Sequence, residues 1–123
     1  SAWAGDKQGK FCTAQGNILT GPEVVEKMVE AFEASEVGAD GRRNRLAVRL
    51  LAALEAGQAA GGDTRGMQSA AILIVGKGQG VWLNNDVVMR LQVDDSPEPI
   101  KELRRLVDSW GERREKGQQR PVK

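Results

Sequence analysis

The sequence predicts an α+β domain in which three helices pack with an antiparallel meander of short strands. Three segments repeat apolar residues at the period of a buried helix face, and a later stretch holds short apolar or alternating runs separated by turns. Of the 123 residues, 40% are hydrophobic and 28% are charged, which is typical of a soluble globular domain with one core. No internal repeat is evident, so we expect one layered domain.

The first ten residues are expected to form a loop or the end of a strand, anchored by Trp3. Residues 11–15 could form a short strand. Gly16 and Asn17 are typical of a turn or bulge, and we expect them to end that strand. Asn17 is then either a turn residue that tolerates a left-handed backbone or a side-chain amide that points into a cleft.

The first helix is predicted to begin at Thr20. Thr20 and Glu23 have the spacing of a capping box, and Pro22 suits the first turn, where its missing N–H has no bonding partner to lose. One face of this helix is apolar and is expected to be buried, namely Val25, Met28, Val29 and Phe32.

A second helix is predicted from about Arg43 to about Ala56, after a glycine-containing break. Gly57 or Gly61 would end it, depending on how far the alanines extend the helix. Its expected buried stripe consists of leucines, namely Leu46, Leu50, Leu51 and Leu54.

The strands of the meander are predicted in the second half of the chain. Residues 70–75 form an apolar run that is typical of a strand covered on both faces. The glycine-rich segment 76–80 is predicted to be a hairpin turn rather than a dinucleotide loop, because a strand-like run follows it and not a helix. That run, 81–83, and the alternating segment 87–93 complete the three strands.

The last helix is predicted to follow an acidic segment that contains two prolines. Ser96 or Asp95 would cap its start and Gly111 would end it. Its apolar stripe is Ile100, Leu103, Leu106, Val107 and Trp110. We therefore assign residues 1–111 to the domain and residues 112–123 to a charged, disordered tail.

The composition excludes several classes of function. Without histidine, this chain cannot supply a Ser-His-Asp triad, a histidine-ligated zinc or an imidazole base. The net charge of +1 gives no general attraction to nucleic acid or to an anionic membrane. No apolar run approaches the roughly 20 residues that span a bilayer. We expect a soluble protein without cofactor, either cytoplasmic or exported.

Two further groups of side chains have a simple structural interpretation. Cys12, the single cysteine, is expected to be a small buried residue, with a nucleophile as the alternative. Asp94 and Asp95, with Asp86, could bind a hard cation through oxygen ligands. Acids ahead of a helix are usually capping and dipole partners, so we predict no metal.

The glycine-rich loop ahead of the strand 70–75 is the candidate site that the residues themselves indicate. A rigid strand that holds a polar loop is a common way to build a site. Asp63 and Arg65 could pair to brace this loop, or Arg65 could bind a substrate carboxylate bidentately. The candidate substrate-binding side chains are Asp63, Arg65, Gln68 and Ser69.

Four runs together resemble one bacterial and archaeal family of unknown function with an N-terminal-nucleophile (Ntn) hydrolase-like fold. They are Trp3-Ala4-Gly5, Gln15-Gly16-Asn17-Ile18-Leu19 with Gly21-Pro22-Glu23-Val24-Val25, the loop 61–71, and the segment 93–100 with Glu102-Leu103-Arg104-Arg105-Leu106. The resemblance covers nearly all of residues 3–110. It implies that the chain is the C-terminal half of a four-layer α-β-β-α sandwich. The nucleophile, a Thr or Ser, would lie in the N-terminal half that is absent here.

This resemblance has two departures and suggests two catalytic candidates. Asp6 and Ser96 stand where the family often has histidines, so any chemistry of those histidines is missing here. Ntn hydrolases often hold the oxyanion with an asparagine amide, which makes Asn17 a candidate for that contact. Ser1 is a candidate nucleophile, since a free α-amino group can act as base for the adjacent hydroxyl. Its place inside the resembling domain favours a cleavage site or a tag remnant.

Two functions follow as hypotheses. In the first, the chain is half of an Ntn-type hydrolase of an amide or peptide bond, and Asn17, Asp63, Arg65 and Gln68 line its cleft. In the second, it is a non-catalytic structural or binding module that keeps the fold. Because half a domain exposes sheet edges and apolar surface, we expect a partner, either the N-terminal half of the same domain or a second copy of the chain.

Overall fold

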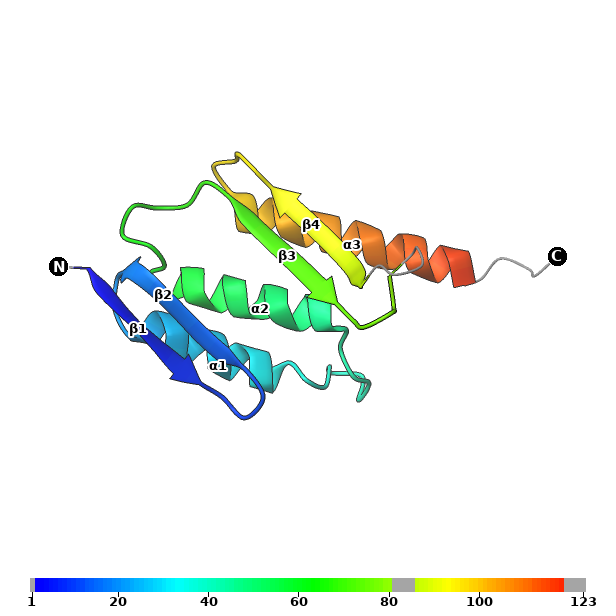
Figure 1. Cartoon of the computed structure of the whole chain (residues 1–123), viewed down its shortest axis with the longest axis horizontal. Helices are drawn as coiled ribbons and strands as arrows, with labels where there is room; N and C mark the ends of the chain where they lie inside the picture. The colour runs from blue at the N-terminus through cyan, green and yellow to red at the C-terminus, as the bar shows by residue number, and fades with distance from the viewer. Residues whose placement is uncertain (1, 81–85, 119–123) are drawn as a thin grey trace. The chain divides into compact units, whose positions relative to one another are not determined.

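The computed structural model describes residues 2–80 and 86–118 and has a mixed α+β fold with three helices and two small antiparallel sheets (Figure 1). The chain divides into two compact units, residues 1–68 and residues 69–123. The first unit contains β1, β2, α1 and α2, and the second contains β3, β4 and α3. The predicted α+β class and the three helices are thus confirmed.

The sheet of the first unit is a hairpin of β1 (Trp3–Gln8) and β2 (Thr13–Leu19). The N–H of Gly9 donates to the carbonyl of Cys12 at 2.8 Å and closes the turn between them. The opening segment, predicted to be a loop or a strand end, is therefore a paired strand. The second strand starts later than predicted and continues through Gly16 and Asn17.

A bulge interrupts β2 where the sequence predicted the strand to end. Trp3 lies opposite Leu19 whereas Gly5 lies opposite Gly16, so β2 has an extra residue between these two pairs. Ile18 takes up the irregularity with a left-handed backbone, at φ 55°. A bulge bends a strand without stopping its pairing, which is why the strand continues to Leu19.

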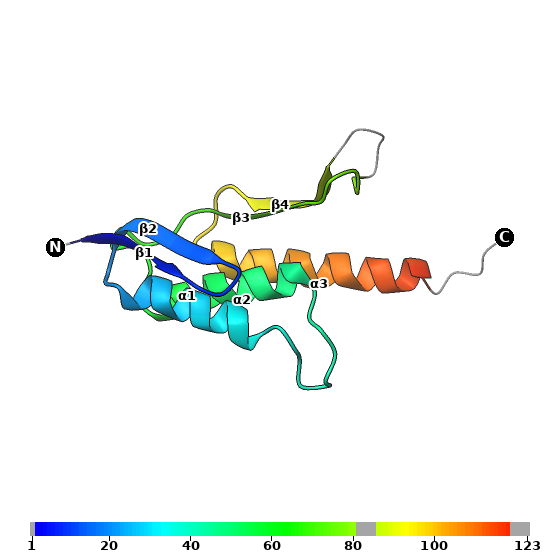
Figure 2. The same cartoon turned by 60° about the horizontal axis from the view of Figure 1, so that its bottom comes forward.

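Helix α1 (Glu23–Ala34) packs on one face of this hairpin (Figure 2). Val25 and Val29 form a buried cluster with Ala14 of β2. Half-buried apolar residues surround the cluster, namely Trp3, Cys12, Leu19 and Met28. In the predicted apolar stripe of the helix, Val25 and Val29 are buried, and Met28 and Phe32 are half-buried.

The start of α1 differs from the predicted capping box. The helix begins at Glu23 after Pro22, and no side chain caps it. Thr20 has another partner, because its backbone N–H donates to the carbonyl of Gly62 at 3.0 Å. The contact with the later loop therefore holds Thr20 outside the helix.

Helix α2 (Leu46–Ala59) packs along α1. It runs through Gly57 and ends just before Gly61, the other predicted end. Of the four predicted leucines only Leu51 is fully buried, and Leu46 is 45% exposed. The other buried positions are small, namely Ala47, Ala53 and Gly57. A Cβ on Gly57 would lie 2.8 Å from Cγ of Met28, so the two helices approach closely at the glycine.

In the second unit, β3 (Ala70–Val75) pairs directly with β4 (Val87–Val93) in an antiparallel register. The bounds of both predicted strands are confirmed. The predicted meander is wrong in its order, since β3 neighbours β4 and no strand lies between them. The run 81–83, predicted to be the middle strand, lies outside the described residues.

One face of the β3–β4 sheet is covered, and the other is exposed. α3 packs on both strands, and Ile72 of β3 is buried. On the opposite face of β3, Leu73 is 53% and Val75 is 62% exposed. The prediction that β3 is covered on both faces is therefore wrong. Within the second unit, α3 covers one face of the sheet.

Helix α3 (Pro99–Gln118) begins at the second of the two prolines, later than predicted, and it also ends later. The hydroxyl of Ser96 accepts the N–H of Glu98 at 3.1 Å, which forms a turn just before the helix in place of the predicted cap. Gly111, predicted to end the helix, lies inside it, and residues 112–118 of the expected tail are helical. A single glycine in a helix costs about 1 kcal/mol, which long flanking runs of helix-forming residues can offset.

The glycine contact between α1 and α2 gives a stability prediction. Gly57→Val should lower the free energy of unfolding by about 1–3 kcal/mol, because the branched side chain would overlap Met28. Ala59→Val, at an exposed site of the same helix, is the control and should cost only about 0.5 kcal/mol. Urea unfolding followed by circular dichroism measures both. Equal losses in the two variants would show that the close contact is not formed.

Candidate functional site

The loop between α2 and β3 begins with two glycines in left-handed conformations. Gly61 has φ 120° and Gly62 has φ 58°, and Gly66 further along has φ 94°. Residues with a side chain rarely adopt such positive φ angles, so this backbone path requires glycine. A Cβ on Gly61 would also overlap the side chain of Thr20. The loop therefore has a defined course against the end of β2.

The loop docks on β2 through backbone hydrogen bonds. The N–H of Thr64 donates to the carbonyl of Ile18 at 2.8 Å, and Thr20 donates to Gly62 at 3.0 Å. Leu19 and Asp63 form an antiparallel bridge. An isolated bridge thus ties the loop to the bulged end of the hairpin, and this fixes the position of Asp63.

Asp63 and Arg65 pair within the loop, as in the first of the two predicted alternatives. Nε and Nη2 of Arg65 donate to the two carboxylate oxygens at 3.0 and 2.8 Å, and the N–H of Arg65 donates to Oδ1 at 2.7 Å. These side-chain bonds, followed by the backbone bond, lower the pKa of Asp63 from 3.8 to about 2. The same pair raises the pKa of Arg65. Both charges are therefore held together at the surface of the loop.

Asn17 directly precedes Ile18, whose carbonyl accepts a hydrogen bond from the loop. Its side chain lies on the outer face of the hairpin. Ala14 points into the core against α1, so by alternation Gln15 and Asn17 point to the opposite face, where both are exposed. Asp6 of β1 is the register partner of Gln15 and shares that face. We call Asp6, Gln15 and Asn17 the polar face. Asn17 is two residues from Leu19, the bridge partner of Asp63.

Two of the remaining candidates stand at the end of the loop, and one lies outside the described residues. Gln68 and Ser69 are exposed at the far end of the loop. Ser1 lies outside the described residues. The sequence provided no reason to include Asp6 and Gln15, because their position beside Asn17 depends on the strand register. The alternation of polar residues in 13–17 was the signal that could have indicated an outer face.

The acidic residues proposed as possible cation ligands have structural partners. Asp86 accepts the N–H of Gly78 at 2.8 Å, and Asp94 accepts the side-chain amide of Gln92 at 2.6 Å. In residues 2–80 and 86–118 no three acidic or cysteine side chains are grouped as a metal site. Among those same residues, no helix combines the length and the apolar character needed to cross a bilayer.

A cavity of about 380 Å³ beside the hairpin turn was not predicted. Its walls come from three segments of the first unit that are distant in sequence. Cys12 is half-buried in the wall of this cavity. It is thus not the fully buried residue that we expected, and its thiol is not freely exposed either. The lining residues are Lys10, Phe11, Cys12, Phe32, Glu33, Glu36 and Arg49.

The fold is similar to that of one solved family protein. The crystal structure of protein SPO2555 from Silicibacter pomeroyi, described as a DUF1028 protein, matches with a TM-score of 0.68 and 31% sequence identity. The match covers 86% of this chain and 39% of that chain, so this chain spans well under half of the solved protein. No curated protein matches. The sequence model of DUF1028, a family of unknown function, matches residues 1–103, and the chain therefore belongs to the DUF1028 family.

Proposed function

We propose that this chain is the C-terminal part of an Ntn-type hydrolase of amide or peptide bonds, with the nucleophile on polypeptide outside it. The observation that carries the proposal is the exposed amide of Asn17 on the polar face, next to the loop that docks at the same end of β2. A substrate lying on this open face would meet hydrogen-bond donors and acceptors held by a sheet. Such a rigid support is what an oxyanion contact requires.

The proposed chemistry assigns a specific task to Asn17. An N-terminal hydroxyl or thiol would attack the carbonyl carbon, with the α-amino group taking its proton and later giving it to the leaving amine. The carbonyl oxygen becomes an oxyanion in that step. Nδ2 of Asn17 would donate a hydrogen bond to it, and the adjacent Asp6 and Gln15 would bind the substrate backbone.

The uncovered sheet faces support the proposed partner, the N-terminal half of the same domain. In the first unit the polar face has no helix on it, and in the second unit Leu73 and Val75 are exposed. In the sandwich that the resemblance implies, each of these faces would pack against another sheet. The 39% coverage of SPO2555 leaves more than half of that protein to supply it.

The Asp63–Arg65 pair favours the second function, a non-catalytic binding module with the same fold. Both oxygens of Asp63 and two of the guanidinium nitrogens are already used within the loop. Asp63 therefore has little capacity left for a substrate, whereas Arg65, 68% exposed, can offer Nη1 and its charge to an anionic group. The loop then acts as a brace with one binding side chain.

Labelling of the N-terminal nucleophile tests the proposed hydrolase. In the full-length protein, an acyl-directed electrophile should modify one N-terminal hydroxyl or thiol, identified by mass spectrometry. Asn17→Ala should slow that labelling about 10²- to 10³-fold, the usual cost of one lost oxyanion donor. Thr13→Ala, exposed on the same strand near the turn, is the control and should leave the rate unchanged. If no N-terminal group is labelled, the binding module is the correct interpretation.

The pKa of Asp63 gives a pH prediction for the loop. A folded pKa of about 2, below the ordinary 3.8, means that the pair stabilises the loop above pH 4 and is lost as the pH falls from 4 towards 2. Arg65→Gln should return the pKa towards 3.8. Carboxyl carbon NMR titration measures it. Arg105→Gln, which breaks the comparable pair with Glu102, is the control and should not change the titration of Asp63.

A further inference from the structure

Ile18 has a strained backbone at the bulged end of the hairpin. Its φ of 55° is the one positive value outside glycine in the part of the chain that the structure describes. A β-branched residue is a genuine outlier there, because its side chain crowds the following carbonyl oxygen. Residues strained in this way persist only where their surroundings determine the backbone, and they cluster at functional sites. Ile18 is therefore a candidate for a functional role.

The bulge at Ile18 changes the alternation of side chains along β2. In a regular strand, side chains two positions apart point to the same face. Asn17 and Leu19 lie on opposite faces, since Leu19 packs against the buried cluster under α1 and Asn17 belongs to the polar face. The bulge accounts for this difference, because β2 has two residues where β1 has one between the flanking register pairs. Without the bulge, either Leu19 would leave the core or Asn17 would turn towards α1.

Contacts on both sides hold Ile18 in its left-handed conformation. On the core side, Leu19 is paired with Trp3, and both pack against the buried cluster of the first unit. On the loop side, the carbonyl of Ile18 accepts the N–H of Thr64 at 2.8 Å. Leu19 and Asp63 form the bridge next to that bond. The core and the docked loop together offset the strain, so the position of the loop and the backbone of Ile18 depend on each other.

We propose that Ile18 is a positioning residue, whose left-handed backbone, held by the docked loop, keeps Asn17 on the polar face. This inference rests on the proposed hydrolase, in which Asn17 donates a hydrogen bond to the oxyanion. A donor of this kind stabilises the transition state only when it is held in place before the reaction. The loop 61–66 then serves the site through the backbone of Ile18.

Ile18→Pro tests the left-handed conformation, because proline fixes φ at about −65°. In the full-length protein this variant should slow labelling of the N-terminal nucleophile about 10²-fold, a usual cost of a misplaced group. Ile18→Asn should keep the wild-type rate, because asparagine tolerates left-handed angles. In the Asn17→Ala background, Ile18→Pro should cause no further loss, since it acts through Asn17. Losses that add in the double variant would overturn the inference, as would a wild-type rate in Ile18→Pro.

Labelling of the wild-type protein separates this inference from the proposed function. If no N-terminal group of the wild-type protein is labelled, the hydrolase proposal fails, and the role of Ile18 fails with it. If the wild-type protein is labelled and the loss in Ile18→Pro adds to that in Asn17→Ala, the role of Ile18 alone fails.

Gly62→Val tests the same connection without a change in β2, so the test does not depend on the folding of Ile18→Pro. A branched side chain disfavours the φ of 58° and would meet the side chain of Gln58, which should undock the loop. Labelling should again slow about 10²-fold, with no further loss in the Asn17→Ala background. A wild-type rate in Gly62→Val, or additive losses, would contradict the role of the docked loop.

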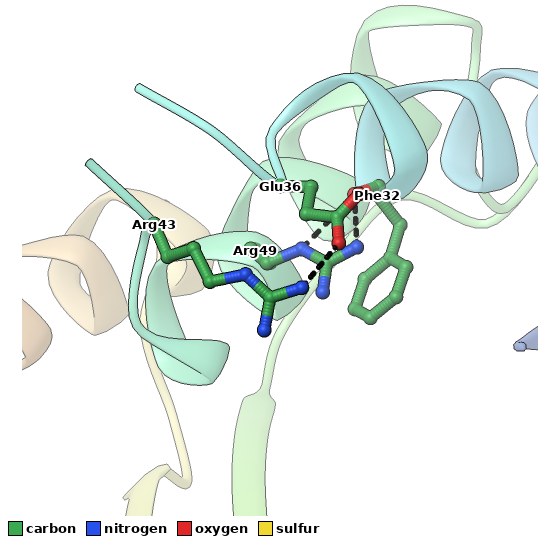
Figure 3. Close-up of polar contacts among 4 residues, drawn as sticks. All are labelled: Phe32, Glu36, Arg43 and Arg49. Carbon is green, nitrogen blue, oxygen red and sulfur yellow. Dashed lines mark hydrogen bonds and ion pairs between the residues drawn. The ribbon is translucent and has the colours of Figure 1, made fainter. Parts of the chain in front are cut away.

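Gly41→Val is the matched control, because Gly41 is also left-handed, at φ 79°, in the connection between α1 and α2. Arg43 donates to Glu36 at 2.9 Å across this connection (Figure 3). Nε and Nη2 of Arg49 donate to the carbonyl of Phe32 at 3.2 and 2.9 Å beside it (Figure 3). Glu36 lines the cavity beside the hairpin turn, at the end of β2 opposite to the bulge, so Gly41→Val should leave the labelling rate unchanged. A loss equal to that of the loop variant would show general destabilisation and overturn the inference.

Discussion

The packing of α1 on one face of the β1–β2 hairpin is the interaction on which the first unit depends. A two-stranded hairpin is at best marginally stable alone, so burial of Ala14 under Val25 and Val29 is what holds the strands in register. The same register decides which side chains point outward. Asn17 reaches the polar face because Ala14, three positions earlier, faces the helix.

Close contacts at two glycines join the hairpin turn and α2 to α1. At Gly9 the hairpin turn sits on α1, and at Gly57 the helix α2 sits on the other side of Met28. A substituent at either position would separate the elements.

Membership of the DUF1028 family identifies relatives without identifying an activity. The similarity to SPO2555 supports the mixed α+β fold, and the chain corresponds to 39% of that protein. The residues proposed for hydrolysis are side chains on an exposed sheet face and on a braced loop. The Asp63–Arg65 pair illustrates the point, since it organises the loop first and leaves only part of Arg65 for binding.

The sequence by itself determined the elements whose signals are local. Helical apolar periodicity marked α1, and turn residues bounded β3 and β4. The acidic segment with two prolines indicated that a helix, α3, follows it. Resemblance of short motifs to a family of unknown function was also sufficient for the family assignment. Each of these depends on residues within a few positions of one another.

Only the tertiary structure decided which glycines lie inside helices and which distant segments pair. Gly57, one of two predicted ends of α2, and Gly111 lie inside helices, because the rest of a helix can offset the cost of one glycine, about 1 kcal/mol. The direct pairing of β3 with β4 and the docking of Asp63 on Leu19 join segments far apart in the chain. Local patterns carry no information about such partners, since the energy of these contacts exists only after the segments have met.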